Sequence, residues 1–239
     1  MSSHHQQVDD LNVLGRLLER TRVLLLDFDG PICAVFADLP AAEVADQLRE
    51  ALTNHGHAER PPEIEASKDP FVIFRYASAL GTQEAHLVEA ALRAHEVEAV
   101  ARAQPTPGSD ELIHAWRATG RGLAIVSNNS RAAVNAYLDA HGLTNCIDLI
   151  SARDEADPAL LKPSHHLVAR AITALGESPV RCTLLGDAVT DVTAAHAAHA
   201  LAIGFANKQH KVDALAHAGA EAVVTQLHAL TSTLLRCDL

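Results

Sequence analysis

The feature that most constrains the fold is a series of short aliphatic runs that end abruptly in polar or turn residues. The clearest run is Val23–Leu26, which Asp27-Phe28-Asp29-Gly30 follows directly. A run of this length, stopped by turn residues, is typical of a strand buried on both faces, as in a parallel sheet. Further strands are predicted at residues 123–126, 147–150, 183–185 and 201–203, with a possible edge strand at 222–224.

Helical patterns separate these strands from about residue 106 onward. Val134 and Leu138 share one face of a predicted helix over 130–141. Another helix is predicted to begin at Pro163, since proline is tolerated in the first helical position, and to end at Gly176. Because strands alternate with helices, the predicted fold class is α/β, with a doubly wound, Rossmann-like parallel sheet.

Residues 36–104 interrupt this alternation. Strand signals vanish there, and helical stretches are predicted over 41–55, 69–80 and 82–103. The apolar face of the third stretch is assigned to Leu87, Ala91, Ala94, Val97 and Ala101. We therefore expect a core domain made of residues 17–35 and 105–239, and an inserted all-helical cap domain over 36–104 that covers the site.

Polar side chains gather where the predicted strands end. Ligands of open parallel α/β sheets bind beyond the carboxyl ends of the strands, so these residues are the candidates for a site. The first strand is followed by Asp27 and Asp29, the second by Ser127 and Asn128, and the fourth by Asp187 and Asp191, while Lys162 precedes the helix that leads to the fourth.

The acidic residues of this set call for a cation. Asp27 and Asp29 are two positions apart, so on extended backbone they face the same side. Hard oxygen ligands without a nearby cysteine or histidine suit Mg²⁺. Taken alone, Asp27 could equally be a turn residue after a strand; the conjunction with Asp187 and Asp191 favours a magnesium site.

These segments together resemble the motifs of the haloacid dehalogenase (HAD) superfamily, in its phosphatase branch, which includes phosphoglycolate phosphatase-like and beta-phosphoglucomutase-like proteins. Asp27-Phe28-Asp29-Gly30 resembles the first motif, Ser127 the second, Lys162-Pro163 the third, and the segment from Gly186-Asp187 to Asp191 the fourth. The order is that of the superfamily, and the spacing leaves room for a cap between the first two motifs. Pro31 departs from the pattern, because a small or β-branched residue is usual there.

The resemblance implies a HAD-type phosphoric monoester hydrolase that depends on Mg²⁺. Asp27 would carry the phosphoryl group as a phospho-aspartate, and Asp29 would act as the acid and base. Mg²⁺ would be held by Asp27, Asp187, Asp191 and the backbone carbonyl of Asp29. Ser127, the backbone around Asn128, and Lys162 would bind the phosphoryl group. The alternatives are a phosphomutase of the same fold and a catalytically silent binding or regulatory module.

Charge and length limit the partners and the location. The formal net charge of −11 argues against a nucleic-acid backbone or an anionic membrane as a partner. The resemblance implies a small phosphorylated metabolite as the partner. No apolar run approaches the roughly 18 residues of a membrane span. Residues 1–10 lack the pattern of a signal peptide, so we expect a cytoplasmic protein. Either a monomer or a homodimer is compatible with the sequence.

Weaker candidates lie outside the motifs. In the cap, Lys68 and Arg75 are candidates to meet a second anionic group of the substrate, although exposed helix charges are the commoner explanation. After the fifth strand, Asn207-Lys208 falls at the expected edge of the sheet.

Overall fold

A computed structural model of the chain describes residues 8–237. Most of segment 1–10, which the sequence predicts not to be a signal peptide, lies outside them. Within the described residues, no helix has both the length and the apolar composition needed to cross a bilayer.

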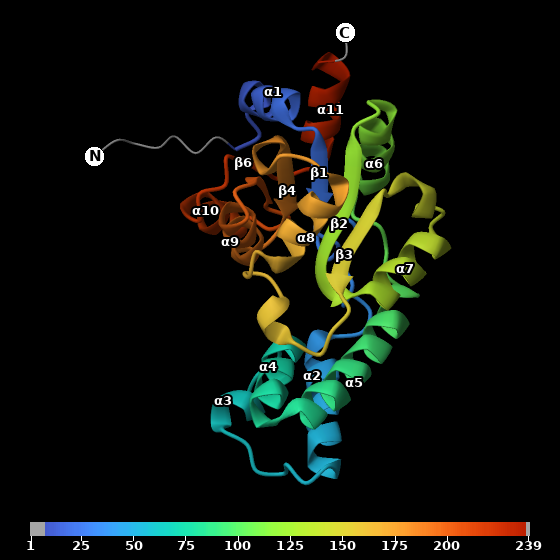
Figure 1. Cartoon of the computed structure of the whole chain (residues 1–239), viewed down its shortest axis with the longest axis vertical. Coiled ribbons are helices and arrows are strands. Elements are labelled where there is room, and N and C mark those ends of the chain that lie inside the picture. The colour runs from blue at the N-terminus through green and yellow to red at the C-terminus, as the bar shows by residue number, and fades with distance from the viewer. Residues whose placement is uncertain (1–7, 238–239) are drawn as a thin grey trace, which may run out of the picture.

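The core is a sheet of parallel strands in the order β3-β2-β1-β4-β5-β6 (Figure 1). Its strands are β1 (Val23–Leu26), β2 (Gly122–Ser130), β3 (Leu149–Arg153), β4 (Cys182–Gly186), β5 (Leu201–Phe205) and β6 (Ala222–Val224). The central strand β1 pairs with β2 on one side and β4 on the other. All four of its residues are buried. The predicted doubly wound α/β fold is confirmed.

Helices cover both faces of this sheet. One face is packed by α1 (Leu11–Arg20), α6 (Ser109–Ala118), α7 (Arg131–Ala140) and α11 (His228–Cys237). The other is packed by α8 (His166–Leu175), α9 (Val189–Ala197) and α10 (Lys211–His217). Short 3-10 turns lie at Thr144–Cys146, Pro158–Leu160 and Pro179–Arg181. The helix α1, which packs against α11, was not predicted.

Several predicted boundaries are wrong. The second strand continues to Ser130 rather than ending at 126. The third strand spans Leu149–Arg153 rather than 147–150, because Asp148 turns its carboxylate back to the amide of Leu123 (2.8 Å) and so precedes the ladder. The helix expected to begin at Pro163 begins at His166 instead. Pro163 lies in the loop before it, directly after Lys162, whose backbone is bound by Asn128.

Between β1 and α6 the chain forms a helical insert, consisting of α2 (Ala41–Asn54), α3 (Pro62–Glu65), α4 (Pro70–Leu80) and α5 (Thr82–Val100). Figure 1 shows these helices beyond the carboxyl ends of the strands. α2, α4 and α5 pack on one another, and α5 also contacts α7 and β2 of the core.

The buried face of α5 is not the predicted one. Val97 is 37% exposed, and Ala94 and Ala101 are exposed as well. The buried positions are Ala85, Val88, Glu89, Leu92, Glu96, Ala99 and Val100. Because Glu89 and Glu96 are part of the buried face, apolar residues alone do not identify it.

Leu25 in β1 tests how far the sheet depends on its central strand. Replacing this fully buried side chain by alanine leaves a cavity, so we expect Leu25→Ala to lower the free energy of unfolding by about 2–5 kcal/mol. Leu80→Ala, at a position 39% exposed, is the control and should change it by less than about 0.5 kcal/mol. Urea unfolding measures both, and equal losses would contradict the assigned core.

Candidate active site

The ends of two strands and the start of one helix bring a cluster of carboxylates together at the carboxyl edge of the sheet. Asp27 follows β1, Asp187 follows β4, and Asp191 lies in the first turn of α9. One carboxylate oxygen from each lies within 4.8 Å of the others, a group able to hold a metal ion. This is the set that the sequence places after the first and fourth strands.

Lys162 supplies positive charge to this cluster from the loop before α8. Its Nζ lies 2.7 Å from Asp27 Oδ1 and 2.6 Å from Asp191 Oδ1, and it donates to the carbonyl oxygen of Val126 (3.1 Å). Burial by itself lowers the pKa of Lys162, but the carboxylates of Asp191 and Asp27 raise that pKa above its usual value. Lys162 is therefore a fixed ammonium between two carboxylates.

Burial dominates the acidity of Asp27 and Asp29. Asp27 Oδ1 accepts the backbone N–H of Phe28 (2.7 Å), yet desolvation, reinforced by Asp191, raises the pKa of Asp27 well above its ordinary value. Desolvation also raises the pKa of Asp29 to about 6, although the backbone N–H of Val35 donates to its carboxylate at 2.9 Å. Asp29 can thus exchange a proton near neutral pH.

Asp187 is held in place from two sides. Lys211, in the first turn of α10, forms an ion pair with its Oδ2, and the side chain of Asn207 donates to the same oxygen (3.4 Å). On the other side lies Gly30, with a positive φ of 107°; a Cβ there would stand 2.4 Å from Asp187 Cγ. The loop after β1 therefore needs glycine for both its conformation and its contact with Asp187.

The end of β2 presents Ser127, Asn128 and Asn129. Ser127 is fully buried and exchanges hydrogen bonds with Asn129 at 3.1 and 3.2 Å. The side chain of Asn128 accepts from the N–H of Lys162 (2.8 Å) and donates to its carbonyl (3.1 Å). Asn128 thereby ties the end of β2 to the backbone that carries the lysine.

The structure places the predicted residues in three positions. Asp27, Asp187, Asp191 and Lys162 are in mutual contact or close to it. The side chain of Asp29 turns to Val35 instead, so its carboxylate is not part of the acidic cluster. Ser127 and Asn128 lie at the end of β2, and Asn128 contacts the lysine directly.

Lys211 is a site residue that the sequence did not reveal. Of the pair singled out after β5, Asn207 contacts Asp187, whereas Lys208 is exposed. Nothing in the residue pattern distinguishes Lys208 from Lys211, because the turn into α10 decides which of them faces the site. In the insert, Lys68 is exposed and Arg75 pairs with Asp69 at 3.6 Å.

The donor set fits a hard divalent cation. Every member of the cluster is a carboxylate, and such oxygen ligands suit Mg²⁺ or Ca²⁺. Asp191 Oδ1 is buried and accepts no hydrogen bond of good geometry; its contact with Lys162 is an ion pair. This oxygen therefore has a lone pair available for a metal ion. The ammonium groups of Lys162 and Lys211 offset only two of the three carboxylate charges, so this edge of the sheet keeps negative charge that can bind a cation.

The sequence model of a protein family, the haloacid dehalogenase-like hydrolases, matches residues 21–199 of this chain. The matched segment includes Asp27, Lys162, Asp187 and Asp191. The chain belongs to this family. The superfamily predicted from the motifs is confirmed, and so is the prediction of a hydrolase.

A curated protein matches part of the chain in sequence. The bifunctional riboflavin kinase/FMN phosphatase of Arabidopsis thaliana is 32% identical over 93 residues, which are 38% of this chain and 24% of that protein. The chain thus spans about a quarter of the length of this curated relative.

Solved structures share the fold over most of the chain. A hydrolase from Pseudomonas syringae superposes with a TM-score of 0.68 at 19% identity, covering 90% of this chain and 99% of its own. A predicted phosphatase from Clostridium acetobutylicum gives a TM-score of 0.66 at 16% identity, with coverage of 90% and 99%. At such identities the likeness shows the fold alone.

Gly30→Ala tests whether the loop after β1 sets the position of Asp187. The new Cβ must displace that carboxylate, so we expect the variant to lose the thermal stabilisation that a divalent cation gives, about 2.7 kcal/mol at a concentration 100 times Kd. Gly56→Ala is the matched control, because Gly56 has a similar φ of 93° but no atom within 4 Å of an added Cβ.

In the absence of the cation, Gly56→Ala should lose roughly 1–2 kcal/mol, since alanine is forced into a left-handed conformation, and Gly30→Ala should lose at least as much, because its Cβ must also displace Asp187. Thermal unfolding with and without Mg²⁺ separates the two effects. If Gly30→Ala kept the full response to the cation, the contact with Asp187 would not matter for binding.

Proposed function

We propose that this haloacid dehalogenase-like hydrolase is a Mg²⁺-dependent phosphatase that removes phosphate from a small phosphorylated metabolite through a phospho-aspartate on Asp27. The observation that carries the proposal is the position of Lys162, whose ammonium contacts both Asp27 and Asp191 beside Asp187. A carboxylate that attacks a phosphate dianion needs such positive charge, because the two anions otherwise repel each other.

The first step forms the intermediate. A carboxylate oxygen of Asp27 bonds to phosphorus as the bond from phosphorus to the ester oxygen breaks. Both donors to Asp27, the N–H of Phe28 and Lys162, engage Oδ1, so we assign Oδ2 to the attack. Asp29 donates its proton to the departing oxygen, which leaves as an alcohol.

The second step releases phosphate. Asp29, now ionised, takes a proton from water as the water oxygen bonds to phosphorus and the bond from phosphorus to Asp27 breaks. Inorganic phosphate departs and both carboxyl groups return to their initial states. The raised pKa of Asp29, about 6, supports this double use as acid and base.

Other groups bind and neutralise the phosphoryl group. Ser127 and the backbone N–H groups around Asn128 are the assigned donors to its oxygens, together with Lys162. Asp27, Asp187, Asp191 and the backbone carbonyl of Asp29 would hold Mg²⁺, which supplies charge that offsets the negative charge on the transferring group.

The helical insert suits the role of a cap. We assign residues 36–104 to a cap domain over the strand ends of a core formed by residues 17–35 and 105–239, in keeping with the position of α2–α5 in Figure 1. Two of the similar proteins support a phosphorylated substrate: the Arabidopsis relative is named an FMN phosphatase in one of its activities, and the Clostridium protein is a predicted phosphatase.

Lys162→Ala tests the charge balance. Without its ammonium the buried carboxylates meet the substrate unscreened, so we expect kcat/KM for an aryl phosphate with Mg²⁺ to fall by about 10²–10³-fold. Lys208→Ala removes an equal charge from the same sheet edge at an exposed position and should leave the rate unchanged. Equal rates for the two variants would refute the role of Lys162.

Asp29→Asn tests the two-step chemistry. The amide cannot exchange the proton, so the phospho-aspartate should form slowly or accumulate, and intact-protein mass spectrometry after rapid quenching should detect it. Asp27→Asn provides the blank, since it offers no carboxylate to phosphorylate. Wild-type turnover by Asp29→Asn would contradict the assignment, and a need for an added bisphosphate in the wild type would indicate a mutase.

A further inference from the structure

A second cluster of charged side chains lies outside the catalytic set, buried between the insert and the sheet. Glu89 and Glu96 come from α5, and Arg153 ends β3. The guanidinium of Arg153 binds the carboxylate of Glu96 with two nitrogens, at 3.0 and 2.8 Å, and lies 3.4 Å from Glu89. The side chains of Arg153 and Glu96 are 1% and 0% exposed.

Glu96 also binds the end of β2. Its Oε1 accepts from the side-chain amide of Asn129 (3.2 Å), and its Oε2 accepts from the backbone N–H of Ser130 (2.9 Å). With the two bonds from Arg153, the buried carboxylate accepts four hydrogen bonds. Asn129 in turn holds the hydroxyl of Ser127.

Arg153 reaches the catalytic lysine through Asn128. Its Nη1 donates to the carbonyl oxygen of Asn128 (2.8 Å), and the side chain of Asn128 forms hydrogen bonds with both the N–H and the carbonyl group of Lys162. The Nζ of Lys162 then contacts Asp27. Direct contacts therefore run without a gap from a helix of the insert to the carboxylate assigned as nucleophile.

The end of β2 needs this support because the sheet does not provide it. The pairing of β2 with β3 shifts register between Ser127 and Ser130, so the ladder skips Asn128 and Asn129. An irregular strand end of this kind re-aims side chains and must be fixed by other contacts. Glu96 and Arg153 are those contacts.

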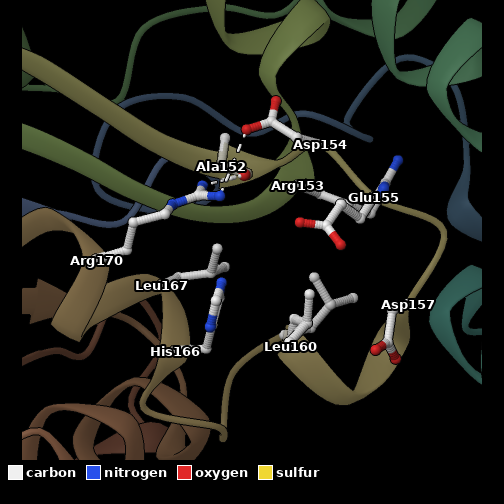
Figure 2. A pocket seen from close by; sticks show the side chains of 10 residues that line it. Ala152, Arg153, Asp154, Glu155, Asp157, Leu160, His166, Leu167 and Arg170 are labelled. Carbon is white, nitrogen blue, oxygen red and sulfur yellow. Dashed lines mark hydrogen bonds and ion pairs between the residues drawn. The ribbon is translucent and has the colours of Figure 1, made fainter.

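The surroundings of Arg153 keep the pair dry. The rings of Phe71 and Phe74 on α4 lie 5.8 and 5.7 Å from its guanidinium. In Figure 2, Arg153 extends away from Arg170, whose guanidinium from α8 binds Ala152 and Asp154 on the other flank of β3. Buried ion pairs add little net stability compared with apolar residues, so stability alone does not explain this one.

We propose that Glu96 is a positioning residue for phosphoryl transfer, through which the insert sets the strand end that grips the phosphoryl group and the lysine beside Asp27. This inference rests on the proposed function, since it concerns the same phosphoryl-binding groups. Glu96 itself touches neither Asp27 nor Lys162; it acts through Asn129 and Arg153.

Glu96→Gln is the test, with Glu89→Gln as its matched control. Both substitutions remove one charge from α5 beside Arg153, but among the two glutamates only Glu96 is bonded to the end of β2. All four partners of Glu96 are hydrogen-bond donors, and the side-chain amide of glutamine would point its own N–H group at some of them. The end of β2 must therefore shift. A misplacement of about 1 Å costs up to about 100-fold in rate, and we expect kcat to fall by roughly 10–100-fold in Glu96→Gln and by less than about twofold in Glu89→Gln.

Binding of inorganic phosphate, measured by calorimetry in the presence of Mg²⁺, gives a readout separate from turnover. Phosphate should bind roughly tenfold or more weakly to Glu96→Gln and with unchanged affinity to Glu89→Gln. Equal kcat values and equal phosphate affinities in the two variants would overturn the positioning role.

The double variant Glu96→Gln/Arg153→Gln separates positioning from stability. It removes the buried guanidinium that loses its two-nitrogen partner in Glu96→Gln, while Glu89 keeps its ion pair with Arg93 (3.6 Å), so its melting temperature should lie above that of Glu96→Gln and its kcat should stay low. A return to wild-type kcat would show that only the loss of the partner of Arg153 mattered. The same double variant carries the test if Glu96→Gln does not fold.

The wild type and Asp27→Asn distinguish the failure of this inference from that of the proposed function. A wild type that releases no phosphate from any ester refutes the proposed function. An active wild type whose Glu96→Gln and Glu89→Gln variants behave alike refutes only the role of Glu96.

Discussion

Repulsion among buried carboxylates at the carboxyl edge of the sheet is the constraint on which the site depends. Asp27, Asp187 and Asp191 bring oxygens within 4.8 Å of one another, and unit charges 4 Å apart repel by about 4 kcal/mol even at an effective dielectric near 20. Lys162 and Lys211 offset two of these charges. Strand β4, the loop before α8 and helix α10 therefore each contribute charged groups to this edge, and a divalent cation would balance the negative charge that remains.

The sequence predicted the parts of this arrangement that follow from periodicity and chain order. Buried strands show as continuous aliphatic runs, and β1 matches Val23–Leu26 at both ends. Because parallel strands end at one edge of a sheet, polar residues at the ends of β1, β2 and β4 were expected to meet there. The start of β3 was missed because Ile147 is apolar like the strand that follows, and only the contact of Asp148 with Leu123 marks the boundary.

What the sequence could not predict depends on which way a helix is rotated about its axis. Lys208 and Lys211 are both plausible partners of Asp187, and the turn before α10 selects the second. On α5 the apolar pattern indicated the wrong face, because charged residues are almost never fully buried unless they are paired. Glu89 and Glu96 lie two turns apart and so share a face, but their partner Arg153 is 57 residues further along the chain from Glu96. A long-range partner of this kind leaves no local signal.

The segments at both ends of the insert contact the loop after β1 or the end of β2. On the way into the insert, the N–H of Val35 binds Asp29, the residue assigned as acid and base. On the way out, Glu96 binds the end of β2, and the hydroxyl of Thr106 donates to the carbonyl of Gly30 at 2.6 Å. Since Gly30 packs against Asp187, each passage of the chain between insert and core touches a group of the charge balance. A shift of the insert would therefore act on these groups, so the insert, which we propose as the cap that chooses the substrate, would also affect the geometry of the reaction.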